Sequence, residues 1–152
     1  MECKTFEKKF GNSLALRAEA KCMLYRYARR VIRCTEKSDG AKTELLFSLP
    51  GIFAMELCFG GKSVRLIKEG DVFRVPERAE KIRCLLKIII LDKAALELLI
   101  AGKVSLNRCA AERRLAFSGG TPFFSAFSRI VCEGDRSLLS DKRYKGSYLS
   151  EK

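Results

Sequence analysis

Residues 52–70 have the sequence IFAMELCFGGKSVRLIKEG. Large apolar side chains alternate here with small or polar ones, and the large ones are Phe53, Met55, Leu57 and Phe59. This period of two is typical of a strand with one face on a core. Gly60-Gly61 is a hairpin turn signal, and a second turn follows at Glu69-Gly70. We therefore predict an antiparallel meander of three strands over residues 52–59, 63–68 and 72–75.

The residues before this meander predict one helix and one strand. Apolar residues at three- and four-residue steps favour a long amphipathic helix over residues 13–36, capped by Asn12 or Ser13. The alternation over Thr43–Leu49 favours a short strand, because Pro50-Gly51 follows as a stop.

The residues after the meander predict a strand, two helices, a strand and a last helix. Residues 82–91 are apolar partly on both faces, as in a central strand that is covered on both sides. Asp92 can cap a helix that runs to Ala101, and a second short helix is expected over residues 104–111. A strand over residues 113–118 precedes Thr121-Pro122, a strong helix start, and that helix should end near Gly134. Residues 135–152 are polar and are expected to form a frayed tail or a short lid around Leu138-Leu139.

This order of elements predicts one α+β domain over residues 1–152. We expect a largely antiparallel sheet of about five strands with helices packed on one face. The length of 152 residues favours a single domain with its own core. The first residues are charged, and the longest strongly apolar run spans residues 88–91. We therefore expect a cytoplasmic protein with neither an export signal nor an integral membrane segment.

The sequence lacks the residues that most enzyme sites need. It has no histidine, which excludes Ser-His-Asp and Cys-His sites. Its seven cysteines are scattered and form no Cys-x-x-Cys pair, so we expect neither structural zinc nor a disulfide framework. Cys109 and Cys132 lie near Arg108 and Arg129, which can activate a thiol, but small buried side chains are the simpler interpretation. We expect no catalytic residue, no metal and no cofactor.

Positive charge is concentrated in the first quarter of the chain. Residues 1–38 hold ten Lys and Arg against four Asp and Glu, which is half of the net charge of +12. Candidate docking residues on the first helix, largely off its apolar stripe, are Arg26, Arg29, Arg30 and Arg33. Such a basic face can dock on an anionic membrane surface. A solvated helix face explains the same pattern.

Four stretches between residues ~43 and 133 resemble the sterol-carrier-protein type-two-like family of lipid-transfer domains. They are FGGKSVRLIKEG (59–70), III (88–90), DKAALELLIAGKVSL (92–106) and RLAFSGG (114–120). The third and fourth stretches together are the more specific ones. The resemblance implies a cavity between the sheet and its helices that holds a lipid.

A ligand in such a cavity would contact apolar side chains of the strands and of the phenylalanine-rich last helix. The predicted ligand-binding residues are Phe53, Met55, Leu57, Leu86, Ile88, Leu99, Phe123, Phe124, Phe127, Ile130 and Val131. We therefore expect non-catalytic binding or carriage of a lipid or another apolar small molecule. A core filled by these same side chains would give the same sequence pattern.

Two other functions stay open. The basic first helix could dock on nucleic acid or on an acidic protein, with Tyr25 and Tyr27 stacking on bases, although nucleic acid is the less expected partner. An accessory factor that presents a lipid-like substrate to an enzyme would combine the cavity with a docking surface.

Overall fold

The computed structural model describes the backbone of residues 2–77 and 80–150 and the side chains of residues 18–77 and 80–138. The chain begins with two helices, α1 (Glu2–Lys37) and α2 (Asp39–Ser48). Four strands follow, namely β1 (Ala54–Phe59), β2 (Lys62–Glu69), β3 (Val72–Arg74) and β4 (Leu86–Ile90). The last elements are α3 (Lys93–Ile100), α4 (Leu106–Ala111), β5 (Leu115–Ser118) and α5 (Thr121–Ser150).

The sheet has five strands in the order β3-β2-β1-β4-β5. β1 pairs antiparallel with β2, β2 with β3 and β4 with β5, whereas β1 and β4 run parallel. The predicted α+β class, the meander and the largely antiparallel sheet are confirmed. The prediction that residues 82–91 form the central strand is wrong, because β4 comprises only Leu86–Ile90 and β1 lies in the middle.

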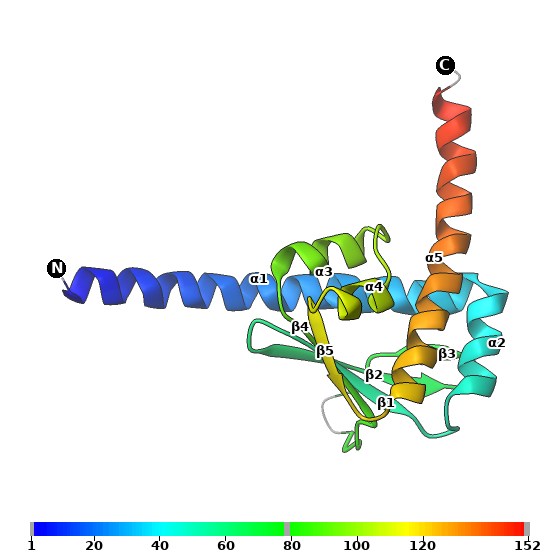
Figure 1. The fold of residues 1–152 in the computed structure, drawn as a ribbon, viewed down its shortest axis with the longest axis horizontal. Coiled ribbons are helices and arrows are strands. Elements are labelled where there is room, and N and C mark those ends of the chain that lie inside the picture. The colour runs from blue at the N-terminus through cyan, green and yellow to red at the C-terminus, as the bar shows by residue number, and fades with distance from the viewer. Residues whose placement is uncertain (1, 78–79, 151–152) are drawn as a thin grey trace.

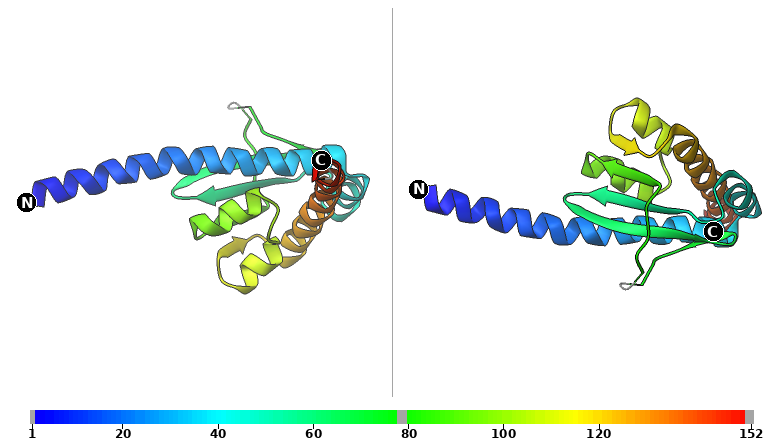
Figure 2. Two further views of the ribbon diagram at one scale, coloured as in Figure 1. Left: turned by 90° about the horizontal axis from the view of Figure 1, so that it is seen from above. Right: turned by 90° about the horizontal axis from the view of Figure 1, so that it is seen from below.

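One face of the sheet is buried and carries much of the core. Its side chains Met55, Leu57, Leu66, Leu86 and Ile88 are each at most 1% exposed. The other face carries polar or exposed neighbours, and Ile89 on it is 37% exposed. The expectation of a strand covered on both sides is therefore wrong here, although the connection from β3 to β4 crosses part of this second face (Figure 2).

The helices pack on the buried face of the sheet, as expected. α1 contacts β1, β2, β3 and α3, while α5 contacts α1 and α2 (Figure 1). The start of α1 and the end of α5 both project from the body (Figure 1). In the part of the chain that the structure describes, no helix combines the length and the apolar character that crossing a membrane requires.

Residues 39–48 form α2 and not the strand predicted over Thr43–Leu49. The Ser38 hydroxyl caps this helix by accepting a hydrogen bond from the Ala41 amide at 3.1 Å. Ala41 and Leu45 lie four residues apart, as a helix requires, and both are fully buried. Phe47 is 80% exposed, so the alternation of apolar residues over Thr43–Leu49 does not reflect one buried face of a strand.

A buried lysine caps the C-terminal end of α2. Lys68 of β2 is 7% exposed, and its Nζ donates to the carbonyls of Leu46 and Leu49 at 3.3 and 3.0 Å. Cations favour the C-terminal end of a helix, where carbonyls lack partners within the helix. Burial lowers the pKa of the Lys68 ammonium.

Both long helices extend beyond their predicted ends. α1 is already helical at Glu2, so the start at Asn12 or Ser13 is wrong. α5 continues through Gly134 to Ser150, so the stop near Gly134 and the frayed tail are also wrong, while residues 151–152 lie outside the described residues. A Cβ at Gly134 would overlap the Cys34 side chain, which shows that this glycine permits a close crossing of α5 over α1.

Candidate functional site

The predicted ligand-binding residues lie in one hydrophobic core between the sheet and the helices. Ten of the eleven are at most 4% exposed, and Phe123 is the half-buried exception. Phe127 packs edge-on against Phe73, with 5.9 Å between the ring centroids. The structure thus brings these residues together as a packed cluster, and their role in holding a ligand stays a prediction.

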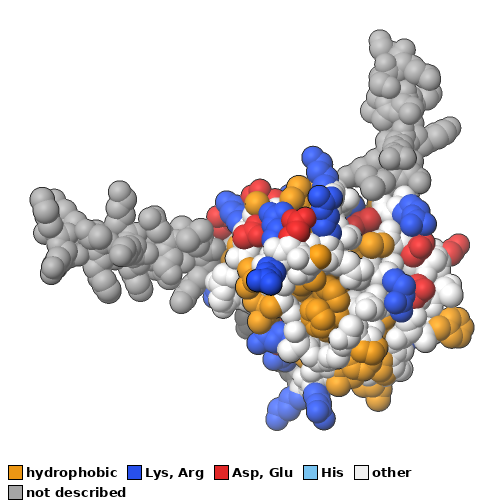
Figure 3. Space-filling view, viewed as in Figure 1, with side chains coloured by type: hydrophobic (Ala, Val, Ile, Leu, Met, Phe, Trp, Pro, Cys, Tyr) orange, Lys and Arg blue, Asp and Glu red, His pale blue; other side chains and the backbone are white. Residues whose placement is uncertain are grey.

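This core reaches the surface at Phe117 and Phe123, and the exposed Ile52 directly precedes the core residue Phe53 in the chain; we define Ile52, Phe117 and Phe123 as the apolar rim. Ile52 is 91% exposed and Phe117 is 36% exposed. Phe117 stacks on buried Phe124 with 4.1 Å between the centroids, and Phe123 packs edge-on against buried Phe53 at 5.6 Å. Figure 3 shows apolar side chains gathered over the start of α5 and the connection from α2 to β1. Aromatic contacts therefore join the surface directly to the core.

The four predicted docking arginines line a second site, which we call the arginine pocket. Arg26, Arg29, Arg30 and Arg33 of α1 surround it together with Ile100 of α3 and Leu138 of α5, and its volume is about 210 Å³. Their spacing of three or four residues puts them on one face of the helix. Three of them are exposed, but the Arg30 side chain is only 11% exposed.

Arg30 is fixed in the wall of the arginine pocket by an ion pair. Its Nε donates to Oδ1 of Asp135 at 2.8 Å, and the Asp135 side chain is 13% exposed. Burial raises the pKa of the Asp135 carboxyl, and the neighbouring Arg30 guanidinium opposes that rise. A Cβ at Gly102, which has a φ of +70°, would overlap the Arg30 guanidinium. Gly102 therefore makes room for Arg30, in a backbone conformation that favours glycine.

Two further observations bear on docking through α1. Tyr27 is fully buried, so the expectation that it could stack on bases is wrong. Among the described side chains, the Tyr27 hydroxyl and Arg30 Nη2 are buried without a hydrogen-bond partner. Tyr25 is 37% exposed and stays available. Docking through the three exposed arginines stays a prediction.

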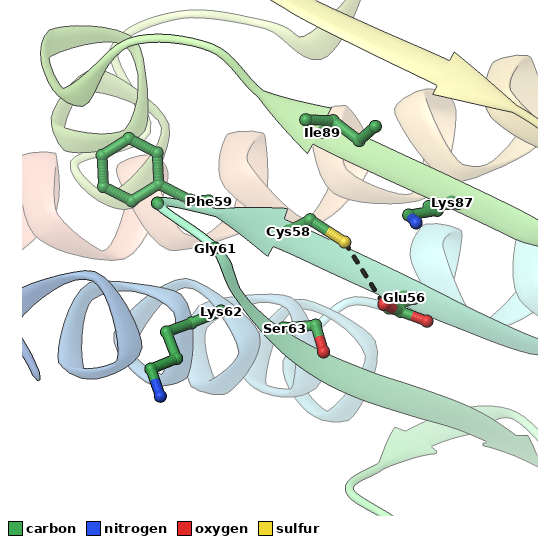
Figure 4. Close-up of a pocket in the computed structure, with 9 residues that line it drawn as sticks. Glu56, Cys58, Phe59, Gly61, Lys62, Ser63, Lys87 and Ile89 are labelled. Carbon is green, nitrogen blue, oxygen red and sulfur yellow. Dashed lines mark hydrogen bonds between the residues drawn. The ribbon is translucent and has the colours of Figure 1, made fainter. Parts of the chain in front are cut away.

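A different pocket, of about 310 Å³, lies on the second face of the sheet near the β1–β2 hairpin (Figure 4). Glu56, Cys58, Lys87 and Ile89 are among its lining residues. The Cys58 thiol lies 3.4 Å from Oε1 of Glu56. Burial and this carboxylate raise the pKa of the Cys58 thiol to about 11, so the thiol is protonated and a poor nucleophile at neutral pH.

The other partly or fully buried thiols also have raised pKa values. Burial is the main cause for Cys34, whose pKa rises to about 12, and for Cys109 and Cys132. These shifts disfavour the thiolate, which supports the interpretation of Cys109 and Cys132 as packed side chains. Within residues 18–77 and 80–138, the side chains form no His, Cys, Asp and Glu cluster suited to a metal ion.

The sequence missed several residues of these sites. Asp135 lies in the predicted polar tail, and Gly102 follows the predicted end of a helix at Ala101 without a predicted role in a site. Ile52 and Phe117 of the apolar rim were not singled out. Leu138 lines the arginine pocket, whereas the Leu139 side chain, the other half of the expected lid, lies outside the described residues.

No protein-family model and no curated protein matches the sequence. Sterol carrier protein 2 from Yarrowia lipolytica, in its apo form, is 13% identical with a TM-score of 0.46, over 70% of this chain and 88% of that chain. A conserved hypothetical protein from Thermus thermophilus, described as a candidate sterol carrier protein, is 14% identical with a TM-score of 0.48, over 73% and 85%. A sec-alkylsulfatase from a Pseudomonas species is 12% identical with a TM-score of 0.44, over 61% of this chain.

This chain spans only 14% of the sulfatase's length. All three TM-scores lie below 0.5.

Proposed function

We propose that this chain binds a lipid or another apolar small molecule and carries it without changing it chemically. The apolar rim is the observation that carries the proposal, because its aromatic side chains join exposed surface to the core between sheet and helices. Sites for such ligands are mostly apolar with few polar groups, as this region is. The resemblance of the sequence to the sterol-carrier-protein type-two-like family supports the same function.

The free energy for binding would come from covering the rim and extending the core. Removing apolar surface from water stabilises a complex by about 25 cal/mol per Å². Ile52, at 91% exposed, and Phe117, at 36% exposed, offer such surface in the free protein. A long hydrocarbon tail would cover both side chains and would itself leave water.

The first turns of α5 are the element that would move to admit a ligand. They follow Gly119-Gly120, whose φ angles of +116° and +110° favour glycine. Phe123 then contacts the ring of Phe53, the residue just before β1, and Phe124 contacts the ring of Phe117 in β5. Because apolar contacts are non-directional, a lipid tail can replace them. The tail would then lie between Phe124 and Phe53, with Phe127 beyond them.

A fluorescent long-chain fatty acid tests the proposal by its change in emission on binding. Phe117→Ser and Ile52→Ser each remove a rim side chain, and Phe47→Ser is a matched control because Phe47 is 80% exposed on α2 outside the rim. We expect the Phe117→Ser and Ile52→Ser variants to bind the probe several-fold more weakly and the Phe47→Ser variant to bind it unchanged. Circular dichroism of each variant confirms that the fold persists.

Equal affinities of all three variants for the fluorescent fatty acid would show that the rim is not part of the binding site. Failure of the unchanged protein to bind fatty acids, isoprenoids or sterols in this assay would contradict apolar-ligand binding as a whole.

A further inference from the structure

The arginine pocket offers a second kind of binding site. Arg26, Arg29 and Arg33 are exposed on successive turns of α1, and the half-buried side chains of Ile100 and Leu138 complete the lining. The pocket has a volume of about 210 Å³, so it accommodates a small anionic group together with part of the molecule that carries it.

As far as the structure describes side chains, the positive charge of this pocket is largely uncompensated. Among the side chains of residues 18–77 and 80–138, no carboxylate lies within 4.0 Å of Arg26, Arg29 or Arg33. Asp135 lies in the adjoining wall, but it is engaged by Arg30 at 2.8 Å. Like charges three or four residues apart on a helix repel each other, and a bound anion relieves that repulsion.

The lining residues match one class of ligand. Guanidinium groups donate paired hydrogen bonds that suit phosphate oxygens, and such charge-assisted bonds are stronger than neutral ones. Ile100 and Leu138 add apolar surface next to the arginines, which suits the carbon part of an organic molecule. We propose that the arginine pocket binds the phosphate group of an organic phosphate ester, with its carbon part against Ile100 and Leu138.

Arg30 contributes positive charge to this site, although its side chain is less exposed than those of the other three arginines. Its guanidinium is held between Asp135 and Gly102, so its positive charge is fixed in the pocket wall. A fixed charge loses little side-chain freedom when an anion binds, which favours binding.

The arginine pocket and the apolar rim are separate. Phe124 and Leu138 are fourteen positions apart along α5, and at a rise of 1.5 Å per residue this separates them by about 20 Å. The phosphate site therefore stands independently of the proposed carriage of an apolar molecule. Its chemistry fits either the headgroup of a membrane lipid or a free phosphate ester.

The test measures binding of glycerol 3-phosphate by titration calorimetry with the full chain. The Arg29→Gln/Arg33→Gln variant removes two exposed charges from the pocket. The Arg83→Gln/Lys87→Gln variant removes two exposed charges away from it and serves as the matched control. We expect the pocket variant to lose at least about tenfold in affinity, equivalent to about 1.4 kcal/mol, and the control to change little.

Vesicle flotation separates the two sources of phosphate. Phosphatidylcholine vesicles with and without phosphatidic acid are mixed with the protein, and glycerol 3-phosphate is added as a competitor. Binding that requires phosphatidic acid and is displaced by the competitor supports the site with a lipid headgroup as its ligand. Binding of glycerol 3-phosphate without vesicle binding supports the site with a free ester as its ligand.

Equal losses of glycerol 3-phosphate affinity in the pocket and control variants would show a general charge effect and overturn the proposal. Absence of binding to both glycerol 3-phosphate and phosphatidic acid vesicles would also overturn it. The fluorescent fatty acid is measured on the same samples, so loss of the phosphate site is distinguishable from loss of apolar-ligand binding.

Discussion

The two ends of the core-facing part of α5 are buried by different means. At the first turns, Phe124 and Phe127 are at most 4% exposed and pack against other aromatic rings. Near Leu138, the side chain of the charged residue Asp135 is mostly buried instead, and it pairs with Arg30. Apolar packing is additive and adaptable, whereas a buried charge depends on one partner. The first turns of α5 can therefore replace one apolar contact by another, whereas the part of α5 near Leu138 depends on the single ion pair between Asp135 and Arg30.

The largest effect is expected at the apolar end. Phe127→Asp places a charge in a fully buried position, and we expect it to abolish folding or apolar-ligand binding. Phe127→Ala should lower the free energy of unfolding by about 3–5 kcal/mol. Phe117→Ala, at a 36% exposed position of the rim, should lower it by about 1 kcal/mol. Urea unfolding followed by circular dichroism measures all three.

A Phe127→Asp variant that folds and binds a fatty acid normally would contradict the assignment of this end of α5 to the core. Equal losses in the free energy of unfolding for Phe127→Ala and Phe117→Ala would contradict the distinction between core and rim.

The charged end should respond to the loss of a single partner. Asp135→Ala leaves the mostly buried Arg30 side chain without its ion-pair partner, and we expect a loss of up to about 3 kcal/mol in the free energy of unfolding. The double variant Arg30→Met/Asp135→Leu replaces both partners by apolar side chains and should recover most of that loss. Thermal unfolding of the single and double variants tests this directly. A double variant as unstable as the single one would show that the pair is not the cause.

The elements that the sequence predicted well are those whose signals are local. The alternation of residues 52–59, the Gly60-Gly61 turn and the Asp92 cap, which accepts from the Ala95 amide at 2.7 Å, each need only a few neighbours. The prediction of a strand over Thr43–Leu49 was wrong, because tertiary contacts determine the secondary structure of that segment. Packing of α2 on α5 buries Ala41 and Leu45, and local alternation does not record that contact.

The sites were less predictable because they depend on contacts between distant residues. Gly134 resembles a helix stop in the sequence, yet it allows Cys34 of another helix to approach. Arg30 resembles the other exposed arginines, and only its contact with Asp135 distinguishes it. Ten of the eleven predicted ligand-binding residues are buried, but their role in binding stays a prediction, because the sequence does not separate a packed core from one that admits a ligand.

Lys68 differs from Asp135, because it is a buried charge whose described hydrogen-bond partners are backbone carbonyls. Lys68→Met keeps most of the apolar stem and removes the two hydrogen bonds to the end of α2. We expect a loss of about 1–2 kcal/mol in the free energy of unfolding, smaller than for Asp135→Ala. Chemical unfolding of the two variants side by side measures the difference. A larger loss for Lys68→Met would mean that helix capping outweighs the ion pair.

The smallest effect is expected at Asp92, which serves as an exposed reference for the buried pair. Hydrogen bonds from Arg114 and then from the Ala95 amide lower the pKa of the Asp92 carboxyl. A lowered pKa stabilises the fold above the unfolded value, near pH 4, and this contribution is lost as the pH falls through the folded value. Because the Asp92 side chain is 41% exposed, the contribution should stay below about 1 kcal/mol.

The Asp92→Asn variant should therefore be slightly less stable than the unchanged protein at pH 7, and the difference should shrink below about pH 4 and vanish as the pH falls through the lowered pKa of the folded state. Thermal unfolding across this pH range measures it. A difference that persists at low pH would assign the effect to helix capping and not to ionisation.

Apolar-ligand binding at the rim is tested by native mass spectrometry of the freshly purified full chain. We expect a population of the chain with an added mass that extraction with organic solvent removes, and a lower such population for Phe117→Ser. The bare chain alone, together with no uptake when fatty acid, isoprenoid or sterol is added, would contradict the claim.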